Sequence, residues 1–356
     1  MGEPDQQAAT SAGPAGPAEE RQQDRRSWFR RLLAEPSVRI TVVAWLAAHA
    51  VVLLVARGRL PFHRPGLHDS PYAIQLLSPT VALLEVFGLM AVVFALTRRR
   101  VVPDVGARAP ERETAKGETS WMVAYGVAGL LGGYVLGRTL GYHPISFHLT
   151  GTLYGTEDTV TPAEVLVWAA YNFVVFAVAP YLWFRRRYTA EQLCLKSGNP
   201  RNDLLVIVVV LVIESVVELL GLSSALFELS PRQAGLGIPL TFAVYFVGTV
   251  LPTMIFIQCV LVPRYRRLTG STATTVILGG VTYTLLHCYD GWLSFSTVGA
   301  GVLSVIFLFL QYFGPGMIKT VLTLRTGNAW VHVWAYHAIA PHTIADTPNV
   351  VKIFKI

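Results

Sequence analysis

Residues 251–267 read LPTMIFIQCVLVPRYRR, an apolar run of helix length that ends in basic residues. A second apolar run follows, in which Tyr283 and His287 have the spacing Y-x-x-x-H, and the later stretch TLRTGNAWVHVWAYHAIAPH (323–342) carries His337. Ionisable side chains are expensive inside a bilayer, so those found within apolar helices are candidates for a functional site. We therefore expect residues 236–342 to form a membrane-embedded core with such a site.

The composition of the whole chain is that of a membrane protein. Of its 356 residues, 53% are hydrophobic and only 14% are charged. A helix needs about 20 apolar residues to cross a bilayer, and the sequence offers a series of such runs, one of them interrupted by Gly314-Pro315-Gly316. These observations predict an all-α, polytopic membrane bundle of about eight or nine transmembrane helices. The runs cover 39–57, 77–97, 120–140, 163–184, 203–222, 239–262, 272–288 and 293–324, with a shorter helix at 328–341.

The net charge of +7 is better explained by membrane topology than by binding to nucleic acid. Arg and Lys gather at the ends of apolar runs, at 98–100, 185–187, 264–267 and 319–325. Basic residues in these positions set the topology of a membrane protein. They predict an integral protein of a bacterial plasma membrane with a cytoplasmic amino terminus, with the lipid bilayer as partner.

The chain divides into four parts by composition. Residues 1–36 lack large apolar side chains over most of their length and are expected to form a disordered cytoplasmic tail. Residues 37–235 supply the amino-terminal transmembrane helices, 236–342 the core, and 343–356 a carboxyl-terminal tail. The three cysteines are too few and too scattered for a disulfide framework or a zinc cluster.

The core resembles the CPBP family, the intramembrane proteases related to the CAAX prenyl endopeptidase. The sequence TGNAW (326–330) followed by His337 is similar to the third motif of that family, and Tyr283-x-x-x-His287 is similar to its second motif, F-x-x-x-H. The first motif differs, because Pro252 and Thr253 stand where the family has paired glutamates. Pro341 stands where it has asparagine. The resemblance implies a helical core and an activity in peptide hydrolysis.

Polar side chains of several helices are expected at one depth of the membrane. Glu85, Asn172, Glu214, Thr253 and His337 each lie a similar number of residues from a basic flank, and 1.5 Å of rise per residue then gives them similar heights. The alternative is that they bond to neighbouring helices and only stabilise the bundle. We assign substrate contacts to the residues at or near this layer: Glu85, Asn172, Thr253, Gln258, Tyr283 and Asp290.

The resemblance also implies roles for the histidines. In that family a glutamate activates water, while histidines and an asparagine stabilise the oxyanion. We expect His287 and His337 to be catalytic here, with Glu214 or Glu218 as a relocated general base. His287 and His337 could instead be two ligands of a zinc ion completed by one of these glutamates. Asp290, three residues after His287, either forms an interfacial turn or orients the imidazole.

The leading function is hydrolysis of a membrane-embedded or prenylated peptide. One alternative is a pseudoenzyme that binds a membrane partner or an isoprenoid, because the family's glutamates and asparagine are missing. Another is an enzyme that transforms a prenyl or terpene lipid in the same cavity, although the sequence has no Asp-rich motif for magnesium and diphosphate. A transporter is a further option, since buried carboxylates suit a proton relay, but no internal repeat is evident.

Overall fold

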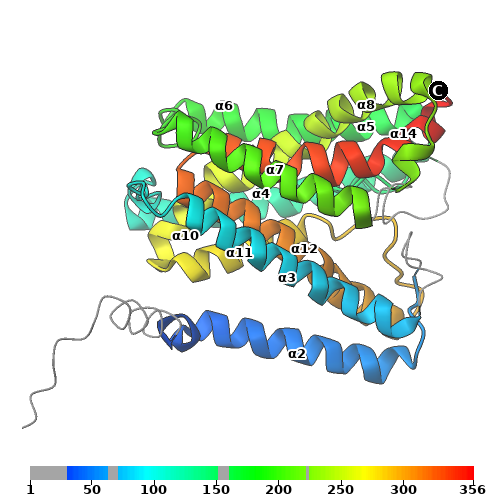
Figure 1. The fold of residues 1–356 in the computed structure, drawn as a ribbon, viewed down its shortest axis with the longest axis horizontal. Coiled ribbons are helices and arrows are strands. Elements are labelled where there is room, and N and C mark those ends of the chain that lie inside the picture. The colour runs from blue at the N-terminus through cyan, green and yellow to red at the C-terminus, as the bar shows by residue number, and fades with distance from the viewer. Residues whose placement is uncertain (1–29, 63–70, 151–159, 222–223) are drawn as a thin grey trace, which may run out of the picture.

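The computed structural model describes residues 30–62, 71–150, 160–221 and 224–356, and throughout these ranges the regular elements are helices without any strand (Figure 1). Seven helical segments there are long and apolar enough to cross a membrane. The protein is therefore a helical bundle of the integral-membrane type. The segments are Pro36–Ala56 (α2), Tyr72–Leu96 (α3), Arg112–Thr139 (α4), Pro162–Arg185 (α5 to α6), Pro200–Gly221 (α7), Pro231–Thr269 (α8 to α10) and Val298–Thr326 (α12).

Two of the predicted helical regions do not form one full-length span. The predicted interruption at Gly314-Pro315-Gly316 is wrong. Helix α11 covers only Thr272–Leu285. The last part of the chain is divided into α13 (Trp330–His332), the π-helices η6 (Val333–His337) and η7 (Ile339–Ile344), and α14 (Ala345–Phe354). Helix α12 continues through Gly314-Pro315-Gly316, because α3 and α11 pack along it and this contact outweighs the local cost of the proline.

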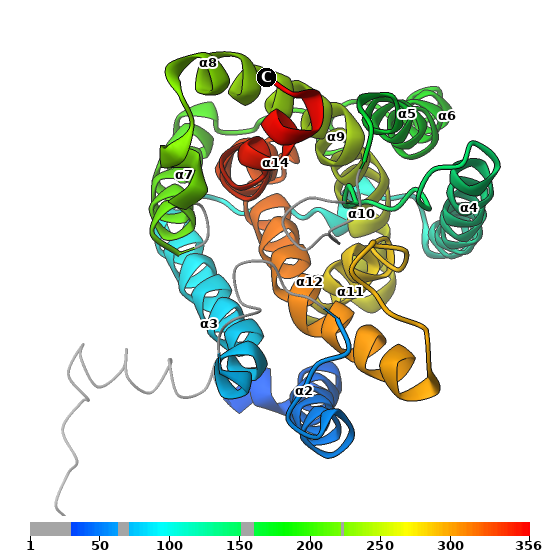
Figure 2. The same ribbon diagram turned by 90° about the vertical axis from the view of Figure 1, so that its right-hand side faces the viewer.

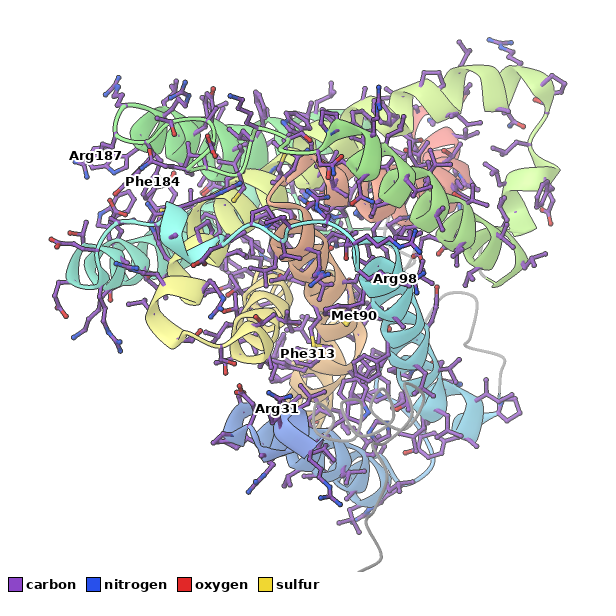
Figure 3. All side chains as sticks on the ribbon, turned by 60° about the vertical axis from the view of Figure 1, so that its left-hand side comes forward. Arg31, Met90, Arg98, Phe184, Arg187 and Phe313 are labelled. Carbon is purple, nitrogen blue, oxygen red and sulfur yellow. The ribbon has the colours of Figure 1, made fainter. Side chains whose placement is uncertain are left out.

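Helix α12 lies at the centre of the bundle. It packs against α11 and α3 and also contacts α2 and α13. Figure 2 shows α12 between α3 and α11. The side chains of Phe313 on α12 and Met90 on α3 belong to the same apolar core (Figure 3). Helix α2 lies at the edge of the bundle and has most of its side chains exposed, as expected for a surface that faces lipid.

The carboxyl-terminal elements form a second group beside α12. Helix α7 packs against η6 and η7, and α14 packs against α8. Residues 345–354, which we predicted to belong to a tail, are therefore a packed helix. Most of the predicted disordered tail, residues 1–29, lies outside the described residues, while α2 begins at Pro36 with the proline in its first turn.

Basic residues at several helix ends are tied to other helices. Arg100 donates to Asp203 at 2.7 Å, and Arg325 donates to Thr97 at 2.9 Å. Arg264 forms a 2.6 Å ion pair with Glu118 and lies over the ring of Phe184, near the end of α6 where Figure 3 also labels Arg187. These contacts join the ends of α3, α7, α12, α4 and α10.

Several segments of the bundle are π-helical rather than α-helical. They are η2 (Phe173–Val178), η4 (Phe246–Val250), η5 (Met254–Leu261), η6 and η7. A π-helical turn disturbs the regular hydrogen-bond ladder and occurs often at functional sites. These segments contain or directly adjoin four residues that the sequence predicts to belong to the functional site, namely Asn172, Thr253, Gln258 and His337.

Candidate functional site

A histidine and an aspartate meet just after helix α11. The helix begins at the cap residue Ser271 and ends at Leu285, and the following turn places His287 and Asp290 on one side. Nδ1 of His287 lies 3.2 Å from Oδ2 of Asp290. His287 is fully buried and Asp290 is 2% exposed. The turn expected at this point thus also supplies an aspartate that orients the imidazole.

Asp290 is held by donors from two other parts of the chain. The hydroxyl of Tyr312 on α12 donates to Oδ2 at 2.5 Å, and the hydroxyl of Ser146 donates to Oδ1 at 2.7 Å. The Tyr312 ring also stacks on the His287 imidazole with 3.9 Å between centroids. A carboxylate with this many donors stays in one position and fixes its histidine.

The hydrogen-bond pattern implies the tautomer of His287. Asp290 accepts the proton on Nδ1, which leaves a lone pair on Nε2. Over the described ranges no hydrogen-bond partner lies near Nε2, although the atom is buried. A neutral imidazole in this state can accept a proton from water or substrate.

The second predicted histidine lies beyond the ring of Tyr283. Nε2 of His337 is 3.4 Å from the Tyr283 hydroxyl, and the Tyr283 ring centroid lies 4.8 Å from that of His287 and 5.8 Å from that of His337. Nδ1 of His337 is buried and has no hydrogen-bond partner in the part of the chain that the structure describes. The two histidines thus flank one tyrosine.

Three more histidines, which were not predicted from the sequence, belong to this group: His148, His332 and His342. His342 lies 5.1 Å from His337 and 6.0 Å from His148 between ring centroids, and His332 lies 5.9 Å from His337. His342 also pairs with Asp346 at 3.3 Å. The five-residue spacing of His332, His337 and His342 was the available signal, because a π-helix, unlike an α-helix, aligns residues i and i+5. No comparable spacing in the sequence indicated that His148 would belong to the group.

The predicted glutamates lie on two other helices. Glu214 and Glu218 lie on α7, which packs against α3, the helix that carries Glu85. Glu214 and Glu218 are 6% and 8% exposed. Helix α7 also packs against η6, the segment that carries Tyr336 and His337. Within the histidine group, the carboxylates bonded directly to imidazoles are those of Asp290 and Asp346.

Lys319, which the sequence predicts to belong to a basic cluster at the membrane surface, lies inside the bundle. It is 1% exposed, and its Nζ lies 3.6 Å from the Tyr283 ring centroid and 5.5 Å from that of Tyr336. No ion pair to it occurs among the described side chains. The sequence suggests one basic cluster of Lys319 and Arg325 because the two are only six residues apart. Of the two, Arg325 is the one that lies at the helix end.

The remaining predicted substrate contacts are buried but play different local roles. Asn172 donates to the Ser146 carbonyl at 2.8 Å and so belongs to the surroundings of Asp290. Gln258 reaches Thr320 on α12 at 3.5 Å. Thr253, at the end of α9 (Leu251–Thr253), is fully buried, and its hydroxyl has no partner within the described ranges.

The expected zinc set is not assembled in this arrangement. No three His, Cys, Asp or Glu side chains of the described residues are grouped so that they could hold a metal ion. His287 and His337 lie on either side of the Tyr283 ring. The donors that are present suit proton transfer better, since His287 has an aspartate partner and His337 a tyrosine partner on one nitrogen.

A cavity lined by His143, Glu164 and Trp168 has only about 10 Å³, which is close to the lower limit for one water molecule. Comparisons of the chain with protein-family models, with curated proteins and with solved structures gave no match. The chemistry of the site therefore has to be argued from its own residues.

Proposed function

We propose that this protein is an intramembrane hydrolase related in plan to the CPBP proteases, and that it cleaves a membrane-embedded or prenylated peptide. The observation that carries the proposal is the pairing of His287 with Asp290, which leaves Nε2 of His287 buried and open. In this proposal the general base is an imidazole oriented by Asp290. It replaces the relocated glutamate that the sequence suggested.

The two histidines have complementary roles in this mechanism. His287 takes a proton from water through Nε2, and Asp290 stabilises the imidazolium that forms. In this mechanism the Tyr283 hydroxyl, 3.4 Å from Nε2 of His337, donates to that nitrogen, which places the His337 proton on Nδ1. This open N–H would donate to the oxyanion that develops on the substrate carbonyl. Water attacks the carbonyl, the peptide C–N bond breaks, and the imidazolium returns its proton to the leaving amine.

The surroundings of the site support a substrate that comes from the bilayer. The histidine group lies inside helices whose outer faces are apolar and exposed, with Leu84 on α3 and Val212 on α7 at 62% and 56%. A prenyl chain or a transmembrane peptide could approach through such a surface without leaving the apolar phase. The resemblance of the core to a prenyl-peptide protease agrees with this class of substrate.

We further propose a bacterial plasma membrane and a cytoplasmic amino terminus. The support is that the basic ends of α3 and α12 meet, through the hydrogen bond from Arg325 to Thr97. Basic residues gathered on one side of a bundle favour the cytoplasmic side. Labelling of single cysteines added near either end of α3, in cells with an intact membrane, tests this orientation.

The function is tested with the full-length protein in proteoliposomes. A set of prenylated and transmembrane peptides is added, and products are identified by mass spectrometry. We expect cleavage by the wild type and a loss of at least about 100-fold in His287→Ala, with a comparable loss in His337→Ala. The matched control is His49→Ala, because the hydrogen bonds of His49 go to Trp45 and Thr80, which are not part of the histidine group.

The alternatives give different results in the same assay. A pseudoenzyme binds peptide without cleaving it, and its binding survives both histidine substitutions. An enzyme acting on isoprenoid lipids leaves the peptides intact and changes the extracted lipids. Cleavage that persists in His287→Ala would overturn the assignment of the base.

A further inference from the structure

A pocket lies between helix α4 and the end of helix α6. Its volume is about 210 Å³, enough for several water molecules or for part of a larger ligand. Trp121 and Trp183, on its wall, are 45% and 43% exposed, so the pocket is accessible from outside the bundle. The lining residues, of which Figure 3 labels Phe184 and Arg187, are Gly117, Glu118, Trp121, Trp183, Phe184 and Arg187.

Aromatic rings form one wall of the pocket. The rings of Trp121 and Trp183 stack with 5.5 Å between centroids and 17° between planes. Tyr125, one turn further along α4, stacks on Trp121 at 5.3 Å. Trp and Tyr are enriched at the level of lipid head groups, because each ring has an apolar body and a polar group at its edge. The wall is therefore suited to the region where head group and acyl chain of a lipid meet.

The acidic residue of the pocket already has a cationic partner. Nε of Arg264 donates to Oε2 of Glu118 at 2.8 Å, and the Tyr188 hydroxyl donates to Oε1 at 2.7 Å. Arg264 is 1% exposed, so this ion pair is formed inside the protein. The charge of Glu118 is thus balanced from the interior, and any further cation at the pocket gives it a net positive charge.

Arg187 supplies that further cation at the rim. Its Nη1 lies 4.0 Å from Oε1 of Glu118, and its side chain is 53% exposed. That separation is too long for a hydrogen bond, so the guanidinium donors remain available to a ligand. The guanidinium carbon lies 4.6 Å from the centroid of the Trp183 ring, which holds the group over the aromatic wall.

The pocket belongs to the basic end of the bundle. Arg264, which holds Glu118, lies on α10, and α10 packs against the short 3₁₀ helix η1 (Gly106–Arg108). Arg108 of η1 donates to the carbonyl of Gly327, directly after α12. The ends of α4, α6, α10 and α12 therefore meet at one end of the bundle. Anionic lipid head groups attract basic residues at such a membrane surface.

We propose that this pocket binds one anionic phospholipid, with its phosphate on Arg187 and its glycerol and upper acyl chain against Trp121 and Trp183. Arginine forms paired, charge-assisted hydrogen bonds with phosphate oxygens. A choline head group fits less well, because Arg187 already covers the ring face of Trp183 that a quaternary ammonium group would need. The exposed apolar side chains of Val123 and Leu182 continue the path of the acyl chains into the bilayer. This site is independent of the proposed hydrolysis.

Titration with defined ligands tests the class of ligand. The full-length protein in a neutral detergent is mixed with phosphatidylglycerol, phosphatidylcholine or inorganic phosphate, and bound molecules are counted by native mass spectrometry. We expect one phosphatidylglycerol to bind at least about 10-fold more tightly than phosphatidylcholine, and phosphate alone to bind far more weakly than either the lipid or its head group requires for retention. Equal affinity for the two lipids would overturn the anionic ligand. Phosphate that binds as tightly as phosphatidylglycerol would overturn the lipid.

Two neighbouring arginines separate the pocket from the general attraction of a basic surface. Arg187→Gln should weaken the binding of phosphatidylglycerol at least about 5-fold. Arg186→Gln is the matched control and should weaken it by less than about 2-fold, because Arg186 does not line the pocket. Both arginines are exposed, so neither substitution removes a buried contact. Equal losses in the two variants would overturn the role of Arg187.

Tryptophan fluorescence locates the bound lipid. Bromine atoms on an acyl chain quench indole rings close to them, so brominated phosphatidylglycerol should quench the wild type more than brominated phosphatidylcholine does. This excess should disappear in the double variant Trp121→Phe and Trp183→Phe, which keeps an aromatic ring at both positions. An excess that persists in the double variant would place the lipid elsewhere and overturn the site.

Discussion

Nζ of Lys319 lies 3.6 Å from the centroid of the Tyr283 ring, in a cation–π contact inside the bundle. The contact joins α12 to α11 at the tyrosine whose hydroxyl reaches His337. A desolvated cation–π contact contributes about 2 kcal/mol, whereas taking an ammonium group out of water costs several kcal/mol. Burying an amine that has no ion-pair partner among the described residues is unfavourable, so we expect Lys319 to lower the stability of the fold.

Substituting Lys319 should separate stability from activity. In Lys319→Met the apolar side chain fills the same space without a buried charge, so we expect a higher melting temperature in detergent. Hydrolysis should fall by at least about 10-fold, because Tyr283 loses the contact that positions it beside His337. Lys352→Met, at an exposed position on α14, is the control and should change neither property. A lower melting temperature in Lys319→Met would show that the lysine is a structural residue.

The thiol of Cys288 should react slowly despite its partial exposure. Burial, with a smaller contribution from the charge of Asp290, raises the pKa of Cys288 from 9.0 to about 11. Only the thiolate is nucleophilic, so alkylation at neutral pH should be about 100-fold slower than at an unperturbed cysteine. Its rate should rise with pH until about 11. The measurement is maleimide labelling followed by mass spectrometry, and Ser296→Cys, in the same connection but exposed, is the reference. Equal rates at the two positions would contradict this.

The apolar runs of the sequence predicted most of the bundle because they depend on local composition. The predicted run at 203–222 corresponds to α7 (Pro200–Gly221), for example. The errors arose where tertiary packing decides. Gly314-Pro315-Gly316 has the composition of a break, yet α12 is continuous, because Gly316 lets α11 approach closely and the burial of both helices offsets the proline.

The candidate site was predictable only where its parts are close in sequence. Tyr283, His287 and Asp290 lie within one turn or two of each other, so their spacing already indicated that they could meet. Glu85 and Glu214, in contrast, lie on helices that are far apart in the chain but pack against each other. Counting residues from the basic flanks predicts that both side chains lie at one depth of the membrane. It cannot predict which neighbour each side chain faces, because depth does not fix the rotation of a helix about its axis.

Gly316→Ala should destabilise the contact between α11 and α12. A Cβ at position 316 would lie 2.8 Å from Cα of Gly280 and 2.7 Å from Cβ of Tyr283, and the backbone atom cannot yield without moving a helix. We expect a loss of about 1–3 kcal/mol of unfolding free energy, measured by denaturation in detergent. Gly88→Ala on α3 is the control, because the added methyl group meets no atom within 4 Å. A Gly316→Ala protein as stable as Gly88→Ala would contradict the close approach.

Asp290→Asn should abolish hydrolysis while leaving most of the fold intact. The new amide group would donate to Nδ1 of His287, which shifts the imidazole proton to Nε2 and removes the lone pair that accepts a proton from water. Activity should fall by at least about 100-fold, with about 1–3 kcal/mol lost from the unfolding free energy. Tyr312→Phe removes one donor to Asp290 without changing the tautomer, so its activity should fall by less than about 10-fold. Nitrogen NMR of labelled histidine reads the tautomer directly, and an unprotonated Nε2 in Asp290→Asn would refute this account of the base.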